Sequence, residues 1–305
     1  MRSWRRCLDL AGVRSAGLRA DYTAAARYLR RREPALYGVV RLQAPAGFLP
    51  HALTGASMLG FTDDVCDKGT PDARVRQLDA WTAHVTRALD TGDSHHPLLR
   101  AFVHSAEAVG LPRHWFDTYL AGTRIDLEFP GFADEAAYQH YIDTLTWPGI
   151  MLSTGLTPHL VPDDEFAASC RLVADACQRT DLLTDLTEDV AEGRFALPRS
   201  DLEHYGVTRE DLERGHATPA VGALVLATAD KARATLLEAG RVVAQVPLEY
   251  RPLVRVLLGL YHHRLDVIGT MAADVVRRPV RDNPADCLRL VSHARQEPLS
   301  VELSA

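Results

Sequence analysis

Hydrophobic residues recur every three or four positions along most of the chain. This spacing is typical of α-helices that bury one face, and it predicts helices over 21–33, 72–92, 164–193, 227–246 and 250–278. The alternating pattern with Asn-Gly turns that marks β-hairpins is absent from the sequence, and no repeat or long polar linker divides the chain. The pattern predicts one all-α domain over 1–305, with residues 1–20 as a candidate flexible N-terminal extension.

The composition is that of an ordinary globular protein. Of the 305 residues, 47% are hydrophobic and 24% are charged. A net charge of −6 provides no basic field that would favour nucleic acid. The longest apolar run, 221–229, is far shorter than the roughly 18 residues of a membrane span. The five scattered cysteines contain no CxxC and the N-terminus lacks the apolar segment of a signal peptide, which together predict a cytoplasmic location.

Two acidic clusters carry the most informative chemistry. Asp181, Asp185 and Asp189 follow one another at four-residue spacing, and Asp63 and Asp67 repeat that spacing upstream. Like charges four residues apart on a helix repel by roughly 0.2–0.5 kcal/mol per pair, so a bound cation is the first explanation to consider. Mg²⁺ takes oxygen ligands and is usually held by one or two carboxylates together with substrate phosphates.

Two such helices that face each other could hold several Mg²⁺ ions and, through them, an anionic diphosphate. The metal would neutralise the diphosphate as it leaves and make ionisation of a C–O bond feasible. A solvated acidic surface is the plain alternative for either cluster alone. Apolar neighbours, Leu59 and Phe61 at the first cluster and Leu182 and Leu183 at the second, favour a shared internal cavity.

The segments around both clusters resemble the aspartate-rich motifs of the squalene/phytoene synthase family. "GFTDDVCDKG" (60–69) is similar to the first motif, and "QRTDLLTDLTEDVAEGRFALP" (178–198) is similar to the second. The second family motif reads Q-L-x-N-x-x-R-D-x-x-E-D-x-x-x-G-R-x-Y-L-P. The chain keeps these positions of it: Gln178, Asp185, Glu188, Asp189, Gly193, Arg194, Leu197 and Pro198.

The resemblance extends over nearly the whole chain. Gly122, Asp126 and Tyr141 match the family's Gly-x-x-x-Asp segment and the tyrosine-bearing helix that follows it. Tyr261 and Arg278 stand where the family has a tyrosine and a diphosphate-binding arginine. The resemblance implies an all-α isoprenoid-synthase bundle with a central cavity lined by both acidic motifs, and a Mg²⁺-dependent prenyltransferase of isoprenoid biosynthesis.

Matching the chain to the family also implies roles for particular residues. The metal ligands would come from Asp63, Asp64, Asp67, Asp185, Glu188 and Asp189. The catalytic positions, which would orient the acceptor or relay a proton, would be Tyr141, Gln178 and Asp181. The groups that contact substrate or diphosphate would be Arg194, Tyr261, Arg278 and Trp147.

Departures from the family pattern change the expected reaction. The tyrosine and arginine that precede the first motif in the family fall on Ala56 and Gly60, and the arginine of the second motif is Thr184. Trp147 replaces one of the small residues that leave room for a prenyl chain in the family, and Pro148 is expected to bend or end the helix. Trp147 would shorten a tunnel or offer a stacking surface, with packing between helices as the alternative. The guanidinium fork of arginine matches phosphate oxygens. Loss of two arginines beside intact carboxylates therefore predicts one metal-bound diphosphate rather than two.

The reaction expected from these departures is transfer of a prenyl group to a small aromatic acceptor in bacterial secondary metabolism. The donor would be dimethylallyl, geranyl or farnesyl diphosphate, and the family's carbazole-prenylating branch is the nearest parallel. Head-to-head condensation of two prenyl diphosphates, as in squalene or phytoene synthases, is the first alternative, and terpene cyclisation is the second. A non-catalytic binding subunit is a further alternative, but it has no physical need to keep carboxylates that repel one another.

Overall fold

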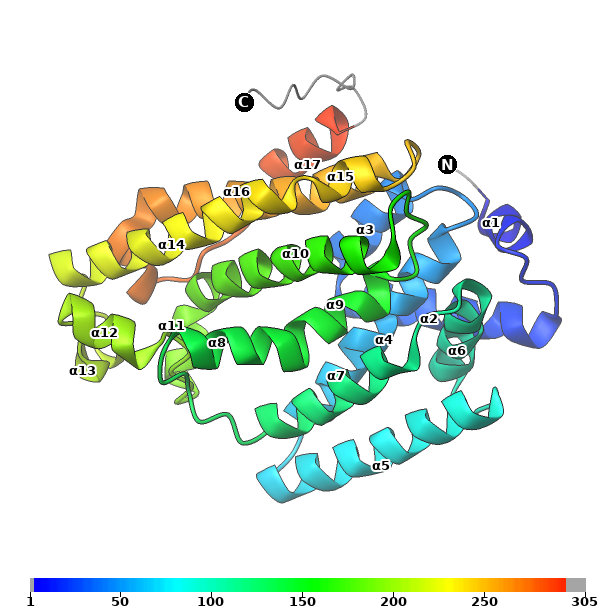
Figure 1. The fold of residues 1–305 in the computed structure, drawn as a ribbon, viewed down its shortest axis with the longest axis horizontal. Helices are drawn as coiled ribbons and strands as arrows, with labels where there is room; N and C mark the ends of the chain where they lie inside the picture. Colours follow the sequence, from blue (N-terminus) through cyan, green and yellow to red (C-terminus); the bar gives the residue numbers. More distant parts are fainter. Residues whose placement is uncertain (1–2, 295–305) are drawn as a thin grey trace.

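The computed structural model describes residues 3–294, which form a bundle of α-helices with no β-strand among them (Figure 1). The first elements are α1 (Trp4–Leu10), α2 (Ala16–Arg32), α3 (Pro34–Gln43), α4 (Leu49–Asp67), α5 (Pro71–Thr91), α6 (Pro97–Val109), α7 (Arg113–Asp126), α8 (Glu135–Tyr141) and the π-helix η1 (Ile142–Thr146). They are followed by α9 (Trp147–Thr154), α10 (Asp163–Thr184), α11 (Leu186–Ala191), α12 (Arg199–Tyr205), α13 (Arg209–Glu213), α14 (Pro219–Ala239), α15 (Val242–Gln245), α16 (Arg251–Met271), the 3₁₀ helix η2 (Ala272–Val276) and α17 (Pro284–His293). The predicted all-α fold class is confirmed. Within the described part of the chain, every helix is too short or too polar to cross a membrane.

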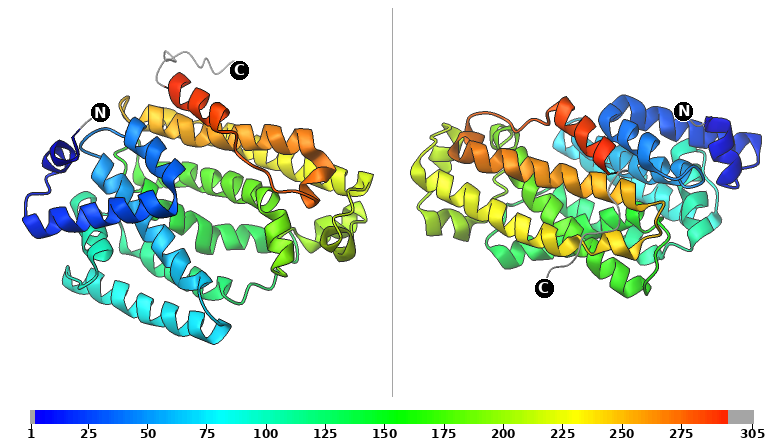
Figure 2. Two further views of the ribbon diagram at one scale, coloured as in Figure 1. Left: turned by 180° about the vertical axis from the view of Figure 1, so that it is seen from behind. Right: turned by 90° about the horizontal axis from the view of Figure 1, so that it is seen from above.

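Helices α4 and α10 occupy the interior of the bundle (Figures 1 and 2). Helix α10 packs along α14 and against α9, α16 and η1, while α4 packs against α2, α5, α6 and α9. Leu53 and Met58 of α4 and Leu183 of α10 belong to one continuous hydrophobic core. The acidic motifs lie at the C-terminal ends of these two helices, where the helix dipole is negative and carboxylates are least favourable.

The five predicted helices are all present, but three of them are interrupted. The predicted helix 164–193 breaks at Asp185, whose backbone (φ −99°, ψ 2°) ends α10 and begins α11. The Asp185 carbonyl accepts from the amides of Glu188 and Asp189 at 2.9 and 2.8 Å, as a helix-starting residue does. Asp181 and Asp189 therefore lie on separate helices. The predicted helix 227–246 spans most of α14 together with α15, and the predicted helix 250–278 divides into α16 and η2.

The N-terminal segment is packed against the bundle from residue 4 onward, which differs from the extension considered from the sequence. Cys7 and Val13 are fully buried. The Trp4 indole Nε1 donates a hydrogen bond of 2.9 Å to Thr23 Oγ1 of α2. These contacts fix α1 against α2.

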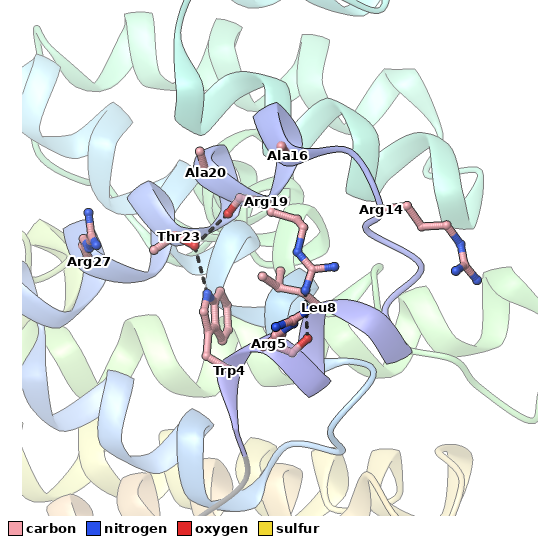
Figure 3. A pocket seen from close by; sticks show the side chains of 9 residues that line it. All are labelled: Trp4, Arg5, Leu8, Arg14, Ala16, Arg19, Ala20, Thr23 and Arg27. Carbon is pink, nitrogen blue, oxygen red and sulfur yellow. Dashed lines mark hydrogen bonds between the residues drawn. The ribbon is translucent and has the colours of Figure 1, made fainter.

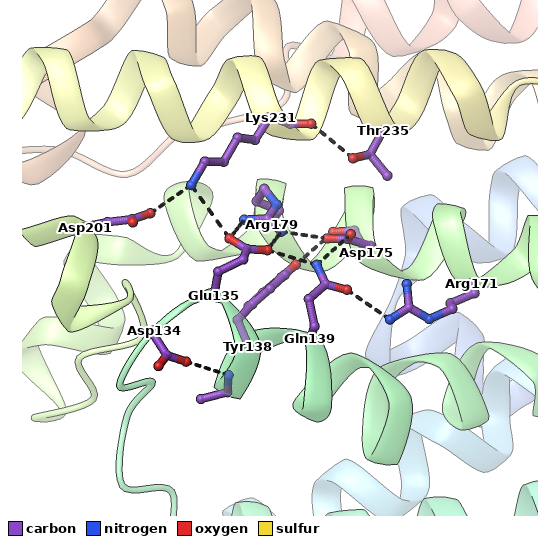
Figure 4. A network of polar contacts seen from close by, with 11 residues as sticks. Asp134, Glu135, Tyr138, Gln139, Arg171, Asp175, Arg179, Asp201, Lys231 and Thr235 are labelled. Atoms are coloured by element: carbon purple, nitrogen blue, oxygen red, sulfur yellow. Dashed lines mark hydrogen bonds and ion pairs between the residues drawn. The ribbon is translucent and has the colours of Figure 1, made fainter.

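A buried polar network fastens α8 to α10 (Figure 4). The guanidinium of Arg179, a residue only 4% exposed, donates to Glu135 at 2.6 and 3.0 Å and to Asp175 at 3.1 Å. It also lies 4.2 Å above the Tyr138 ring, and the Tyr138 hydroxyl donates to the Asp175 carbonyl at 2.9 Å. Because a buried charge is stable only when it is paired, this network fixes the turn of α8 that carries Tyr141.

Candidate active site

A polar pocket joins the two acidic motifs. Its volume is about 480 Å³, and its lining comes from Glu33, Asp63, Asp181, Thr184, Asp185, Tyr261, Arg264, Val280 and Asp282. Asp63 belongs to α4. Asp181 lies on α10, and Asp185 is the first residue after the end of that helix. The fold therefore gathers carboxylates that are far apart in the sequence around one space.

The pocket environment disfavours the ionised form of these carboxylates. Burial raises the pKa of Asp181 to about 7, with Arg264 opposing and Asp185 adding to the shift. Burial also raises the pKa of Asp63 to about 6, although the nearby Arg32 opposes the effect. The pKa of Asp185 is raised as well, mainly by burial. A cation between these groups would stabilise their ionised forms.

The pocket residues suit Mg²⁺ held jointly with a diphosphate. Between residues 3 and 294, no three carboxylate, histidine or cysteine side chains are placed to hold a metal ion by themselves. Mg²⁺ does not require such a cage, since one or two carboxylates usually hold it together with phosphate oxygens. Asp63 and Asp185 line the pocket from opposite motifs and could serve in this way. Their role as metal ligands stays a prediction.

Arg264 supplies a positive charge to the pocket that the sequence analysis did not select. Its guanidinium forms two hydrogen bonds with Asp282, at 3.0 and 2.8 Å, and its Nη1 lies 3.5 Å from Asp181 Oδ1. The Tyr261 hydroxyl donates to the other oxygen of Asp181 at 3.3 Å. The only sequence signal for Arg264 is its position three residues after Tyr261, which places both on one face of α16.

Arg32 brings a second unforeseen guanidinium to the first acidic motif. Its Nε donates to Asp64 at 3.2 Å, and its Nη2 lies 3.5 Å from Asp63 Oδ2. A Cβ atom built on Gly60 would lie only 3.0 Å from Arg32 Nη1 and 3.2 Å from its Cδ. The guanidinium of α2 therefore fills the space above the position at which the family motif carries its own arginine.

A second polar cluster lies where Asp126 of α7 and Tyr141 of α8 meet Arg194, a residue of the second motif that follows α11. The Tyr141 hydroxyl donates to Asp126 at 3.0 Å, and Arg194 Nη2 donates to the same oxygen at 3.3 Å. The Arg194 guanidinium also lies 3.9 Å from Asp189 and 4.5 Å above the Phe129 ring. Burial and the neighbouring Asp126 raise the pKa of Tyr141, so its hydroxyl stays protonated and acts as a donor.

Two further predicted residues occupy the region around the π-helix η1. Gln178 accepts a hydrogen bond of 3.0 Å from Thr146, the last residue of η1. Short π-helices occur frequently at functional sites. The Trp147 indole donates to the Ala167 carbonyl at 2.9 Å and packs 5.0 Å from the Trp115 ring. Trp147 is therefore anchored between helices, and these contacts describe a packing role.

The remaining predicted residues do not line the pocket. Asp64 instead accepts a hydrogen bond from the Tyr28 hydroxyl at 2.9 Å. The Arg278 side chain is 65% exposed and pairs with an aspartate of its own segment. Asp67 and Glu188 are not among the residues that line the pocket. The part of the chain that the structure describes therefore shows no contact between Arg278 and the acidic pocket, whereas Arg264 lines that pocket.

The chain matches a known family over most of its length. The family profile of squalene/phytoene synthases matches residues 37–284. The bifunctional protein CrtB/UppS of Streptomyces coelicolor is 31% identical over 252 residues, which cover 81% of this chain but only 43% of that protein. Presqualene diphosphate synthase of Rhodopseudomonas palustris is 26% identical over 227 residues, covering 74% of this chain and 80% of that protein. The chain therefore belongs to the squalene/phytoene synthase family and is a prenyltransferase by class.

Solved structures agree with this assignment. Squalene synthase HpnC of Alicyclobacillus acidocaldarius superposes with a TM-score of 0.76 at 26% identity, over 88% of this chain and 99% of that one. A dehydrosqualene synthase in complex with ligand gives a TM-score of 0.81 at 16% identity, over 92% and 96% of the two chains, and so shares the fold. The isoprenoid-synthase bundle expected from the sequence is confirmed.

Proposed function

We propose that this protein condenses two prenyl diphosphates head to head in a Mg²⁺-dependent reaction. The observation that carries the proposal is the supply of guanidinium groups around the acidic residues. Arg32 fills the space over Gly60, Arg264 lies beside Asp181, and Arg194 lies on the second motif. Arg32 and Arg264 bring positive charge to motifs that lack two of the family's arginines, whereas Arg194 is an arginine that the second motif keeps. The two added guanidinium groups remove the main reason for expecting a single diphosphate.

The relatives support the same function. Presqualene diphosphate synthase of Rhodopseudomonas palustris and phytoene synthase of Mycobacterium tuberculosis are 26% and 25% identical to this chain. Their names favour condensation over transfer to an aromatic acceptor. Condensation was the first alternative from the sequence, and it now becomes the main proposal.

Each part of the pocket has a role in this proposal. Mg²⁺ bound by Asp63 and Asp185 with diphosphate oxygens would supply charge neutralisation for the leaving group. Arg264 in the pocket, and Arg32 beside Asp63 at its edge, would bind diphosphate oxygens through their guanidinium forks. Tyr141 stays protonated and donates its one hydroxyl hydrogen to Asp126, so it would hold Asp126 and Arg194 in position beside the second motif rather than remove a proton.

Transfer to a small aromatic acceptor is the second candidate, and Thr184 favours it. Thr184 stands where the family has an arginine, it is 8% exposed, and its hydroxyl donates to Asp185 at 3.1 Å. A threonine at this position cannot reach a phosphate as an arginine does. This candidate requires that the site bind one diphosphate and one arene.

A cytoplasmic place of action is part of the proposal. All five cysteines are free thiols in the structure, including the fully buried Cys7. Free cysteines are usual in a reducing compartment.

Product analysis tests the proposed function. The protein is incubated with radiolabelled farnesyl diphosphate and Mg²⁺, with and without NADPH and with and without carbazole. We expect a product that contains two prenyl chains when no acceptor is present, and none after addition of EDTA. A prenylated arene formed only with carbazole would support the second candidate instead. A hydrocarbon built from one prenyl chain would indicate a cyclase and overturn both.

A further inference from the structure

A groove lined by arginines lies on the N-terminal helices and shares no residue with the acidic pocket (Figure 3). It is open to solvent and has a volume of about 610 Å³. Its apolar surface comes from Trp4, Leu8, Ala16 and Ala20, and its charged surface comes from Arg5, Arg14, Arg19 and Arg27.

The walls of the groove are fixed by hydrogen bonds between α1 and α2. The Arg19 guanidinium donates to Asp9 at 2.7 Å, to the Val13 carbonyl at 3.0 Å and to the Arg5 carbonyl at 3.2 Å. Trp4 donates to Thr23, as described above. Arg19 is thus neutralised and braces the groove, which keeps its shape without a ligand.

The other three arginines of the groove carry uncompensated charge. Arg5, Arg14 and Arg27 are exposed, and none forms an ion pair with any residue between 3 and 294. The first 32 residues of the sequence contain nine arginines and two aspartates, a net charge of +7, whereas the rest of the chain carries −13. Such asymmetry favours an anionic partner at the N-terminal end of the molecule.

The apolar component of the groove decides which anionic partner fits. Arginines beside an accessible tryptophan side chain are typical of helices that lie at the boundary between lipid headgroups and acyl chains. Trp4, on the short helix α1, is partly exposed and lines the groove. An acidic face of a second copy would satisfy the arginines but would leave this apolar side chain without a complementary surface.

We propose that this arginine groove docks the protein on a membrane surface rich in anionic phospholipids. Arg5, Arg14 and Arg27 would bind lipid phosphates through their guanidinium forks, while Trp4 would contact the acyl boundary. Helix α2 has 17 residues and leads from the groove to Arg32, so docking would hold the acidic pocket within about 25 Å of the bilayer. Prenyl chains partition into bilayers, which would give such docking a use in the proposed function, but the inference does not depend on that function.

Vesicle sedimentation tests the proposal with the full chain and no prenyl substrate. We expect the protein to bind vesicles made of equal parts phosphatidylcholine and phosphatidylglycerol, to ignore pure phosphatidylcholine, and to dissociate as salt is raised. The triple variant R5Q/R14Q/R27Q should lower the partition coefficient roughly a hundredfold. The matched control R76Q/R87Q/R199Q removes the same charge from exposed positions outside the groove and should retain most binding.

Each other outcome contradicts the proposal. Equal binding to both vesicle types, or an equal loss in the two triple variants, would show that the groove is not the docking site. Light scattering that detects self-association, lost in the groove variant and without vesicle binding, would assign the groove to a second copy of the chain. Circular dichroism of all three proteins shows whether they fold, so the vesicle result can be interpreted even if no condensing activity is found.

Discussion

The guanidinium of Arg32 lies directly over Gly60, so that a Cβ at position 60 would be 3.0 Å from Arg32 Nη1. Arg32 of α2 supplies the positive charge, and Gly60 of α4, which has no side chain, leaves room for it. The first acidic motif thus has an arginine beside it although its own sequence contains none.

Replacing Arg32 tests whether this guanidinium binds substrate. Loss of a hydrogen bond to a charged group costs about 1.5–3 kcal/mol, so Arg32→Ala should raise KM for the prenyl diphosphate by roughly tenfold or more. The double variant Arg32→Ala/Gly60→Arg should recover part of the affinity for the prenyl diphosphate, because an arginine from α4 then occupies the space that Arg32 left. Steady-state kinetics measures both.

The matched control is Arg100, which forms two hydrogen bonds at 2.6 and 2.8 Å with Asp21, a residue outside both acidic motifs. Arg100→Ala should lower stability and leave KM unchanged. A wild-type KM in Arg32→Ala would show that Arg32 only braces the acidic motif.

Asp185→Asn tests the assignment of the carboxylates to Mg²⁺. The substitution removes one charge from a pocket whose neighbouring aspartates already resist ionisation. Activity should fall by roughly a hundredfold or more, while Tm measured without Mg²⁺ should be unchanged or higher because repulsion is relieved. Asp117→Asn, an exposed position on α7, is the control. Full activity of Asp185→Asn with Mg²⁺ would make the metal assignment wrong.

Gly122 tests the packing of α7 against the π-helix. A Cβ there would meet the Thr144 carbonyl oxygen at 2.2 Å, a distance that requires the backbone of η1 to move. Gly122→Ala should lower the free energy of unfolding by about 3 kcal/mol or more, as overpacking against rigid backbone does. Gly38 of α3 has no atom within 4 Å of an added Cβ, so Gly38→Ala should be neutral or stabilising by about 0.5–1 kcal/mol. Equal effects in urea denaturation would contradict this.

A half-buried histidine pair predicts acid sensitivity of the fold. The Tyr22 hydroxyl lies 3.3 Å from His51 Nδ1 and 2.8 Å from His104 Nδ1. Burial lowers the pKa of both imidazoles from the ordinary 6.5, so the folded state prefers them neutral, although Glu107 opposes the effect at His104. Their contribution to stability is therefore present above pH 6.5 and is lost as the pH falls through the folded pKa values.

The double variant H51Q/H104Q isolates this effect. The pocket aspartates, whose pKa values are raised, contribute in the opposite sense in both proteins. The difference in free energy of unfolding between wild type and variant should shrink as the pH falls from 7.5 to 5. A difference that stays constant over this interval would argue against the assignment.

Helical periodicity identified the fold class and five helices because each buries one apolar face over several turns. It could not locate the break at Asp185, since the apolar pattern runs on through α11 without interruption. The break depends on the backbone hydrogen bonds of Asp185, whose carbonyl accepts from the amides of Glu188 and Asp189. The spacing of apolar side chains does not predict these hydrogen bonds.

Sequence motifs also identified Asp63, Asp181 and Asp185, which the fold gathers into one pocket. They could not identify Arg32, because its position over Gly60 depends on how α2 crosses α4. Arg278 was chosen by its place in the family pattern. Arg264 lines the pocket because it lies on the same face of α16 as Tyr261. Missing arginines in a motif are therefore weak evidence that a site lacks positive charge.

The number of diphosphates that the pocket holds tests the central claim most directly. Isothermal titration calorimetry in the presence of Mg²⁺ would count the molecules of farnesyl thiodiphosphate, a donor analogue that ionises slowly, bound per chain. Condensation of two prenyl diphosphates predicts two analogue molecules per chain, with the weaker one lost in Arg32→Ala. A wild-type protein that binds one analogue at saturation, and a second ligand only when an arene is supplied, would contradict it.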